Sequence, residues 1–383
     1  MSTSEATGSQ TFQEDDALAL DAVDEFVGFE TTVRTVVKRP RPATASTLTL
    51  EADDLATASM LTADDAIRLI PGVVLVQHGA EGKGYQFFVR GFDALHGADI
   101  ETRIAGVPFN EWSNVHASGY LDLSIIPPEI VSSVEVTKGP FGIDQGLFAT
   151  AASIHYGLGI AERNRGGRAW YTAGSSNRHR LLLSYAPTSL DDRSFVTAEV
   201  LSDDGFGEGR ATRRAGATAR TTLYSDRQSN LTLFVAGSTS RFQLPGIVRL
   251  DDVEAGRLDI RDSYESDRWR GESDRALASL EYSRRNEAVN SVARLYGMAR
   301  RLTLVENFTG FLGDPVNGDA FQQSHDGFLV GFDAEQLREF NDRWALTFSV
   351  GGRGERVQQT EDALDANGEV MINTRAVEGI QTG

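Results

Sequence analysis

The chain has 383 residues, and 37 Lys and Arg stand against 55 Asp and Glu, which gives a formal net charge of −18 at pH 7. A chain of this length can bury a large core, so a wholly disordered or miniature protein is excluded. The excess of acid argues against nucleic acid as a partner, because binding phosphate needs clustered Lys and Arg. The sequence contains no cysteine, which excludes a disulfide framework, a thiolate zinc site and a cysteine nucleophile.

Residues 1–43 form an acidic leader. Every charged residue before Arg34 is an acid, and Pro40 and Pro42 close the segment with backbone that cannot continue a helix. Such a composition buries little apolar surface and indicates a flexible segment. Within it, residues 31–37 (TTVRTVV) are a β-prone run, which is either a short linker strand or a segment that adds to the sheet edge of a partner.

Residues 44–163 have the pattern of a compact mixed α/β unit. Thr62, followed by two acids, is typical of a helix N-terminus, and we expect a short helix that ends at Pro71. The apolar run after it, residues 73–76, predicts a buried strand. Further short strands are expected at residues 87–91, 103–106 and 133–137, with glycine-containing loops at 77–84 and 109–119.

From residue 166 onward, apolar and polar residues alternate with the period of a β-strand. We count about nine such strands, at residues 167–174, 179–186, 194–202, 216–224, 229–240, 274–284, 289–300, 326–338 and 344–357. After the first hairpin, short connections (187–193, 225–228, 285–288, 339–343) alternate with long ones (203–215, 241–273, 302–325). Outer-membrane barrels have this asymmetry between their two ends, whereas a β-sandwich, which stays the alternative, has no reason for it.

Four short motifs resemble the plug domain of TonB-dependent outer-membrane receptors. They are DAIRLIPGV (65–73), VRGF (89–92), IAGVP (104–108) and VEVTKGP (134–140), in the order of that family and at about its spacing. The chain departs from the family's pattern at Ala105, where Asp is usual, and at Lys138, where Arg is usual. The resemblance implies a mixed α/β plug domain followed by antiparallel transmembrane β-barrel strands.

The resemblance also implies the domain boundaries. They are a flexible periplasmic leader at 1–43, a plug domain at 44–163 and the N-terminal portion of an outer-membrane barrel at 164–383. Nine strands are too few to close a barrel around such a plug, and an open strand edge is not viable in lipid. We therefore expect further strands beyond residue 383 and a signal peptide before Met1, which would make the chain a fragment.

On this resemblance the function is active import of a scarce solute across the bacterial outer membrane, with a siderophore–iron or similar chelate as the favoured solute. The implied partners are the C-terminal domain of TonB with its inner-membrane energising complex, the small-molecule or metal-chelate ligand, and outer-membrane lipid. A plugged barrel for signalling, adhesion or secretion without import stays open, as does a secreted β-sandwich binding module or polysaccharide enzyme. The six histidines are scattered with no metal-ligand spacing, so we expect no catalytic residue, no metal site and no cofactor.

Three groups of residues are the predicted sites. The TonB box of the family falls on Thr31, Thr32, Val33, Arg34, Thr35, Val36 and Val37. The loops at the outward end of the plug would bind the ligand through Gln77, His78, Phe109, Asn110, Trp112, Asn114 and His116, although these aromatic rings could instead only pack against the barrel wall. Structural contacts between plug and barrel are assigned to Arg90, Gly91, Glu135, Lys138, Gly139 and Pro140. Arg90 is expected to pair with carboxylates of the wall at Glu199, Glu281, Asp333 or Glu335, the alternative being a solvent-exposed Arg at a strand end.

Overall fold

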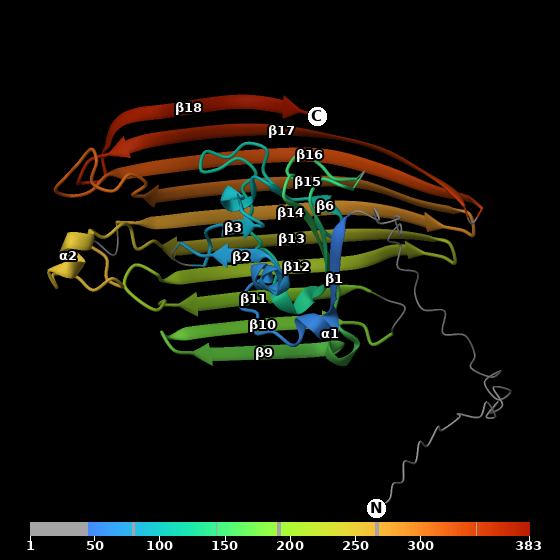
Figure 1. Cartoon of the computed structure of the whole chain (residues 1–383). Coiled ribbons are helices and arrows are strands. Elements are labelled where there is room, and N and C mark those ends of the chain that lie inside the picture. Colours follow the sequence, from blue (N-terminus) through green and yellow to red (C-terminus); the bar gives the residue numbers. More distant parts are fainter. Residues whose placement is uncertain (1–44, 79–80, 143, 190–192, 265–267, 342) are drawn as a thin grey trace, which may run out of the picture. The chain divides into compact units, whose positions relative to one another are not determined.

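The computed structural model describes residues 45–78, 81–142, 144–189, 193–264, 268–341 and 343–383. The predicted TonB box at 31–37 lies outside these ranges. Within them, no helix is long and apolar enough to cross a membrane. A small mixed unit packs against one face of a large antiparallel sheet (Figure 1).

The mixed unit, which we call the plug, contains two small sheets. The larger has the strand order β1-β7-β8-β5-β6, in which β5 and β8 run parallel and the other neighbours antiparallel. Its strands are β1 (Ser46–Glu51), β5 (Ile100–Ile104), β6 (Val107–Pro108), β7 (Val131–Lys138) and β8 (Ala152–Leu158). The smaller consists of β2 (Val73–Val76), β3 (Gln86–Val89) and β4 (Phe92–Asp93). The helices are α1 (Ala52–Leu55) and the 3-10 turns η1 (Ala63–Leu69), η2 (Leu95–Gly97), η3 (Pro128–Ile130) and η4 (Glu162–Asn164).

The predicted helix start is confirmed, with a change of helix type. Thr62 is the N-cap of η1, and its backbone N–H donates to the Asp65 carboxylate at 3.0 Å in a capping box. The segment winds as a 3-10 helix and ends before Pro71. The prediction of a buried strand at 73–76 is wrong for most of its residues. Only Leu75 is buried, because β2 is an edge strand of its small sheet and turns Val74 and Val76 to solvent.

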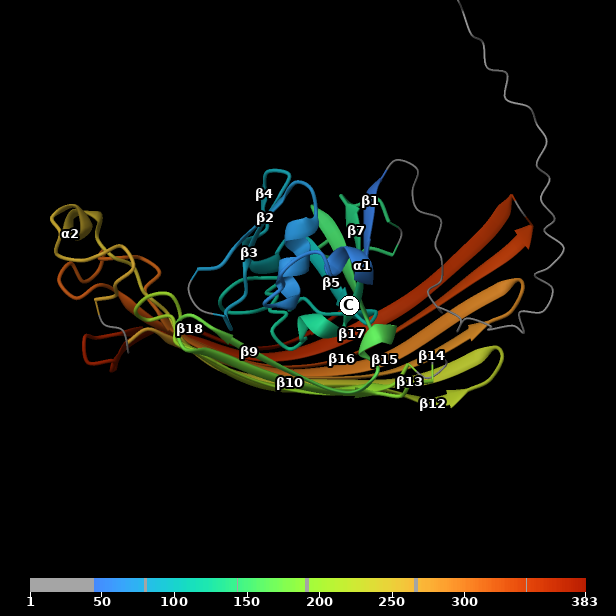
Figure 2. The same cartoon turned by 90° about the horizontal axis from the view of Figure 1, so that it is seen from below.

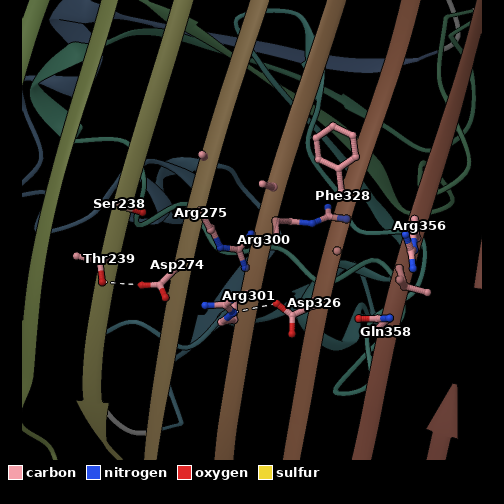
Figure 3. A pocket seen from close by; sticks show the side chains of 14 residues that line it. Ser238, Thr239, Asp274, Arg275, Arg300, Arg301, Asp326, Phe328, Arg356 and Gln358 are labelled. Atoms are coloured by element: carbon pink, nitrogen blue, oxygen red, sulfur yellow. Dashed lines mark hydrogen bonds and ion pairs between the residues drawn. The ribbon is translucent and has the colours of Figure 1, made fainter. Parts of the chain in front are cut away.

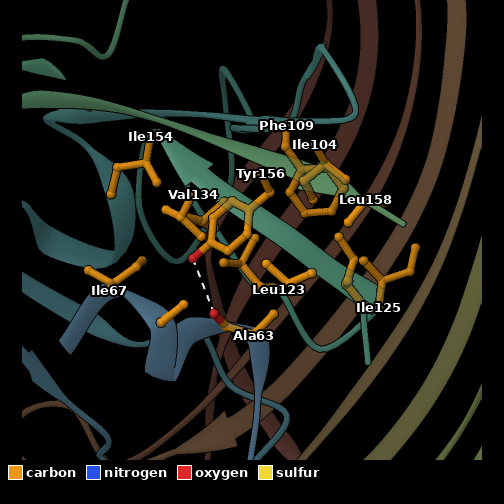
Figure 4. Close-up of a cluster of buried hydrophobic side chains, with 14 of the residues drawn as sticks. Ala63, Ile67, Ile104, Phe109, Leu123, Ile125, Val134, Ile154, Tyr156 and Leu158 are labelled. Carbon is orange, nitrogen blue, oxygen red and sulfur yellow. Dashed lines mark hydrogen bonds between the residues drawn. The ribbon is translucent and has the colours of Figure 1, made fainter. Parts of the chain in front are cut away.

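The plug core lies between its five-stranded sheet and η1 (Figure 4). Ile104, Val134 and Ile154 from three neighbouring strands are fully buried and face Ile67 of η1. The Tyr156 hydroxyl, also buried, donates to the Ala63 carbonyl oxygen at 3.2 Å. Burial of large aliphatic side chains contributes about 1.5–3 kcal/mol each to folding, so this cluster stabilises the plug and joins both layers.

The large sheet has ten strands in sequence order, each antiparallel to its neighbours. The strands are β9 (Gly166–Gly174), β10 (Arg178–Ala186), β11 (Phe195–Asp203), β12 (Thr212–Ser225), β13 (Ser229–Gln243), β14 (Arg270–Arg285), β15 (Val289–Glu306), β16 (Ala320–Asn341), β17 (Trp344–Leu364) and β18 (Val370–Thr382). The alternation predicted the first nine of these. It did not predict β18, whose pairing with β17 is interrupted by two register shifts that break the period of two.

The connections differ between the two ends of the sheet, as predicted. At one end lie 187–194, 226–228, 286–288 and 342–343, and at the other 175–177, 204–211, 244–269, 307–319 and 365–369. The helix α2 (Leu250–Glu254) lies in the longest connection. The predicted loops at 241–273 and 302–325 were too long, because β13 to β16 extend further than the stretches whose alternation predicted them. We call the end with the longer connections the long-loop end.

The two faces of the ten-stranded sheet have opposite character. One face carries exposed apolar side chains, among them Val196, Val235, Leu280, Leu295, Val330, Phe332, Leu346 and Phe348. The other face is concave, holds the plug and is rich in buried charge (Figure 2). The helix α2 and the neighbouring connections lie beyond the plug at the long-loop end (Figure 1).

Candidate functional site

Two plug loops meet the sheet at the long-loop end. The Lys83 ammonium donates to a Glu306 carboxylate oxygen at 2.6 Å, where β15 ends. The imidazole of His116 lies 2.9 Å from the side-chain oxygen of Gln323, near the start of β16. The predicted loops 77–84 and 109–119 therefore lie side by side at one end of the plug, next to the longer connections.

Three histidines gather between these loops. The Nε2 atoms of His96 and His116 are 3.3 Å apart, and their ring centroids are separated by 4.8 Å. His78 is exposed, and its ring centroid lies 5.7 Å from that of His96. Tyr120 and Phe308 pack on the His116 ring at centroid distances of 5.8 and 5.6 Å. The structure thus adds His96, which is buried, to the two predicted histidines.

Both inner histidines are held in the neutral form. Burial, together with the positive charge of Lys83, lowers the pKa of His96 to about 4. The same two causes hold the pKa of His116 well below its usual value. At neutral pH their imidazoles therefore present lone pairs to a ligand.

The other predicted ligand residues have different surroundings. Asn110 is buried, and its side chain accepts from the Thr102 backbone N–H and donates to the backbone carbonyls of Ile100 in β5 and Gly119 in its own loop. Phe109 is buried in the plug core. Asn110 and Phe109 therefore have structural roles in the plug. Gln77 donates to the Lys83 carbonyl oxygen at 3.2 Å, and Asn114 donates to Glu111 at 2.5 Å.

Trp112 lies where the plug meets the ten-stranded sheet. It is partly exposed, and the Arg353 guanidinium lies 4.6 Å from its ring centroid. Its backbone N–H points to a Glu355 carboxylate oxygen at 3.4 Å. The guanidinium cation and the aromatic face attract each other electrostatically. Arg353 of the sheet therefore holds the Trp112 ring in place, while part of the ring surface stays exposed.

Buried ion pairs join the plug to the sheet. Glu111 of the plug, 1% exposed, lies 3.2 Å from Arg275 of β14 and 3.6 Å from Arg300 of β15. Asp122 of the plug also contacts Arg275, at 3.1 Å. Burial alone would raise the pKa of Glu111, but the guanidinium groups of Arg300 and Arg275 keep it below its usual value.

A second group of ion pairs lies near β10 to β12. Glu81 of the plug contacts Arg178 at 2.9 Å and Arg214 at 3.4 Å. Glu129 forms a two-pronged pair with Arg180, with N–O distances of 2.5 and 2.8 Å. In both groups the plug supplies the acid and the sheet supplies the arginine, a polarity that sequence analysis did not predict.

A hollow of about 490 Å³ on the apolar face of the sheet is not part of this site (Figure 3). Small residues such as Ala276 and Ala299 line it. The ion pair between Arg301 and Asp326, at 2.9 Å, also borders it. These side chains lie on the face of the sheet that turns away from the plug and its loops.

The comparisons with known proteins agree with this architecture. Residues 39–153 match the family model described as the TonB-dependent receptor plug domain. The vitamin B12 transporter BtuB of Vibrio vulnificus (strain CMCP6) is 28% identical over 131 residues, which cover 34% of this chain and 20% of that protein. Residues 39–153 of this chain are a TonB-dependent receptor plug domain.

Solved structures share the receptor's fold. The unliganded ferric citrate transporter FecA has a TM-score of 0.66 at 13% identity, covering 88% of this chain and 52% of that one. The siderophore receptor PiuA from Acinetobacter baumannii has a TM-score of 0.64 at 16% identity, with coverage of 88% and 52%. The copper transporter OprC has a TM-score of 0.62 at 14% identity, with coverage of 87% and 50%. The receptor chain thus spans about half the length of these structures.

Family membership confirms several predictions. The mixed α/β plug followed by antiparallel strands is the fold of these receptors. The described part forms an open sheet of ten strands, not a closed barrel. Receptors of this family are proteins of the bacterial outer membrane and are not enzymes. The exposed apolar face of the sheet is the surface that such a location requires.

The predicted contact of Arg90 with the wall is wrong. Arg90 is exposed and forms the two-residue turn between β3 and β4 with Gly91, at φ values of 49° and 89°. In the described part of the chain it makes no ion pair with the sheet. The expected partners are paired otherwise, since Glu281 and Asp333 contact Arg294, Glu199 contacts Arg180 and Arg214, and Glu335 accepts from Ser349.

The other residues assigned to plug–barrel contacts lie within the plug. Lys138 is buried and donates from its ammonium to the Pro71 carbonyl oxygen at 2.6 Å, which ties β7 to the end of η1. Gly139 has a φ of +86°, and a Cβ there would come within 2.4 Å of the Phe141 ring, so glycine is required. Glu135 lies in β7 opposite Thr49 and His155, and Pro140 is exposed.

Contacts between plug and wall come from a different turn. Ala105 and Gly106 join β5 to β6 with φ values of 48° and 83°. A Cβ on Gly106 would lie 2.5 Å from the Arg294 guanidinium of β15. The turn therefore rests directly on this arginine of the sheet.

Proposed function

We propose that this receptor imports a scarce metal chelate, of the siderophore–iron kind, across the outer membrane with energy supplied through TonB. The observation that carries the proposal is the plug, which is held in the concave face of the sheet by buried ion pairs and turns two loops toward the long-loop end. The names of the similar proteins, which include vitamin B12, ferric citrate and copper transporters and a siderophore receptor, favour a solute that carries a metal.

The proposed ligand residues of the two loops are the partly or fully exposed Gln77, His78, Trp112 and His116, together with the buried Asn114. The aromatic ring supplies apolar area at low entropy cost, and the amides and imidazoles supply directional contacts. Phe109 and Asn110 support this surface from beneath, Phe109 through the core and Asn110 through hydrogen bonds to β5 and to its own loop.

Uptake of labelled chelates by cells that express the receptor tests the import. We expect uptake that disappears when TonB is deleted, while binding to the cell surface stays the same. Binding with no uptake in cells that have TonB would contradict import and favour the signalling or adhesion alternative.

Replacing Trp112 tests the ligand surface. Trp112→Ala should weaken chelate binding by about 2 kcal/mol or more, as for a buried aromatic anchor. Trp344→Ala is the matched control, because Trp344 is exposed on the apolar face of the sheet, away from the plug. Receptor amounts in the outer membrane are measured in parallel. Unchanged affinity in Trp112→Ala would remove this residue from the ligand surface.

Proline substitutions test the coupling segment. Residues 31–37 should pair in extended form with a strand of TonB through backbone hydrogen bonds. Val33→Pro and Val36→Pro each remove one N–H, so uptake should stop while chelate binding persists. Ala17→Pro, in the same leader, is the control. If both valine variants import normally, the coupling segment lies elsewhere.

A further inference from the structure

The histidine pair between the plug loops has an unusual hydrogen-bonding arrangement. The Nε2 atoms of His96 and His116 face each other at 3.3 Å. A hydrogen bond between them requires a proton on one of the two atoms. The protonation of each ring follows from the partner of its other nitrogen.

In both rings the proton lies on Nδ1. The Nδ1 of His96 faces the Gly84 and Tyr85 carbonyl oxygens at 2.9 and 3.1 Å, and a carbonyl oxygen only accepts. The Nδ1 of His116 faces the side-chain oxygen of Gln323 at 2.9 Å. The orientation of that amide is fixed because its nitrogen donates to the Glu361 carboxylate at 2.6 Å.

With Nδ1 as the donor, each ring turns its Nε2 acceptor toward the Nε2 of the other ring. Two lone pairs at this distance repel each other unless a cation lies between them. The surrounding contacts hold both rings in place: Tyr120 and Phe308 pack on His116, and His96 is buried against its two carbonyls. The arrangement is thus held by contacts from the plug and from the sheet together.

We propose that His96 and His116 bind a borderline divalent metal ion of the Zn²⁺ class through their Nε2 atoms. With Zn–N bonds of about 2.0–2.1 Å, two nitrogens at a tetrahedral angle lie about 3.3–3.4 Å apart, which matches the observed separation. Metal-bound histidines almost always donate their other N–H to a carbonyl or similar oxygen, and both histidines here do so. The chemistry of imidazole selects zinc, copper and nickel over magnesium or calcium.

The histidine pair supplies only two ligands, so it leaves the coordination shell of the metal ion incomplete. In the described part of the chain no group of three or more His, Cys, Asp or Glu side chains is arranged around a common metal position. The remaining positions are therefore left to water or to donor atoms of a small chelator. His78 is the nearest further imidazole.

The positive charge of Lys83 is offset by its pair with Glu306 at 2.6 Å. The proposal concerns binding alone and stands whether or not the receptor imports.

Titration of the purified full receptor with Zn²⁺, in a buffer without chelating anions, tests the proposal. We expect saturable binding of one ion, weakened at least about 100-fold in His116→Ala and about 10-fold in Gln323→Ala, which removes the oxygen that orients His116. His179→Ala is the matched control and should bind like the wild type, because His179 is exposed and stacks on Tyr171 on the apolar face.

A second readout separates direct ligation from loss of folding. Cu²⁺ bound to the wild type should show electron paramagnetic resonance couplings to two imidazole nitrogens, and one coupling should vanish in His116→Ala. Folding of each variant is checked by heat-modifiable gel mobility. The proposal is overturned if the wild type shows no saturable binding, if His179→Ala loses as much affinity as His116→Ala, or if folded His116→Ala keeps both couplings. Intact uptake with lost Zn²⁺ binding would leave import standing and show that the metal site is separate from it.

Discussion

The two faces of the ten-stranded sheet are built from the same strands, yet they stabilise the protein by different means. In β15, Arg294 and Arg300 point toward the plug and are enclosed by carboxylates. Leu295 lies between them in sequence, points the other way and is exposed. Alternate residues of one strand thus meet a charged interface on one side and the membrane on the other.

The comparison shows how the surroundings of an ion pair decide its energy. Glu272 and Arg241 form a pair at 3.2 Å on the outer face, where both side chains are about half exposed. Glu111 and Arg275 form a pair at the same distance on the inner face, where both are nearly inaccessible. Exposed pairs contribute about 0–1 kcal/mol. A buried pair adds little net stability when intact, but losing one partner leaves the other charge buried and unpaired.

The largest effect we expect comes from breaking the inner pair. Glu111→Ala leaves Arg275 and Arg300 without this acid and should destabilise the plug by about 3–5 kcal/mol. Glu272→Ala, the matched change on the outer face, should cost at most about 1 kcal/mol. Urea titration of the folded receptor, followed by protease cleavage within the plug, measures both. Equal effects of the two substitutions would show that burial does not distinguish the two faces.

A charge placed on the outer face should have the next largest effect. Leu295→Lys puts an ammonium group in the apolar band and should destabilise the folded receptor by about 2–4 kcal/mol. Thr303→Lys, on the same strand and face but beyond the band, should cost about 0–1 kcal/mol. Folding equilibria in lipid vesicles measure both changes. If Thr303→Lys is as damaging as Leu295→Lys, the apolar band has been assigned to the wrong part of the strands.

The smallest effect we expect is a pH dependence of plug stability. Asp64 is buried, and one of its carboxylate oxygens has no hydrogen-bond partner among the described residues. Burial and the nearby charges of Asp122 and Asp65 hold the pKa of Asp64 well above its usual value. The folded plug therefore binds a proton more tightly than the unfolded chain, and stability falls as pH rises from the ordinary carboxyl range through the raised pKa. The change in plug stability is limited because the Asp64 carboxyl takes up a proton instead of remaining charged in its buried position.

Asp64→Asn should remove this pH dependence. Urea midpoints between pH 5 and 8 should fall with rising pH in the wild type more steeply than in the variant. Asp53→Asn, which changes an exposed carboxylate of α1, is the control and should follow the wild type. Parallel curves for the wild type and Asp64→Asn would contradict a raised pKa.

Local patterns were enough to predict much of the architecture. The cap at Thr62 and the alternation of residues 274–284 depend on neighbours close in sequence, and the structure confirms both. The extent of β16 was not predictable in this way, because beyond the apolar band both faces are polar and the alternation disappears. The alternation of apolar and polar residues therefore identifies the part of a strand that lies in lipid. It is absent where the strand extends beyond the lipid.

The site depends on contacts that no spacing reveals. The spacing of His96 and His116 in the sequence is not one that predicts a metal site, and only the packing of η2 against the loop 109–119 brings their Nε2 atoms together. Arg90 carries the charge expected of a contact with the wall, but the β3–β4 turn points it to solvent. Alternation shows which strand residues face inward, yet it does not show that inward Arg275 would meet Glu111 of the plug.

The length of the strands has a consequence for access to the plug loops. β16 has 22 residues, which at about 3.3 Å per residue extend over about 70 Å, whereas the apolar band of such proteins is about 25 Å tall. Even when tilted, this strand stands well clear of the membrane as hydrogen-bonded sheet, with β15 and β17 beside it. His116 is bordered on this side by the extended part of β16, through Gln323, and by the connection 307–319, through Phe308.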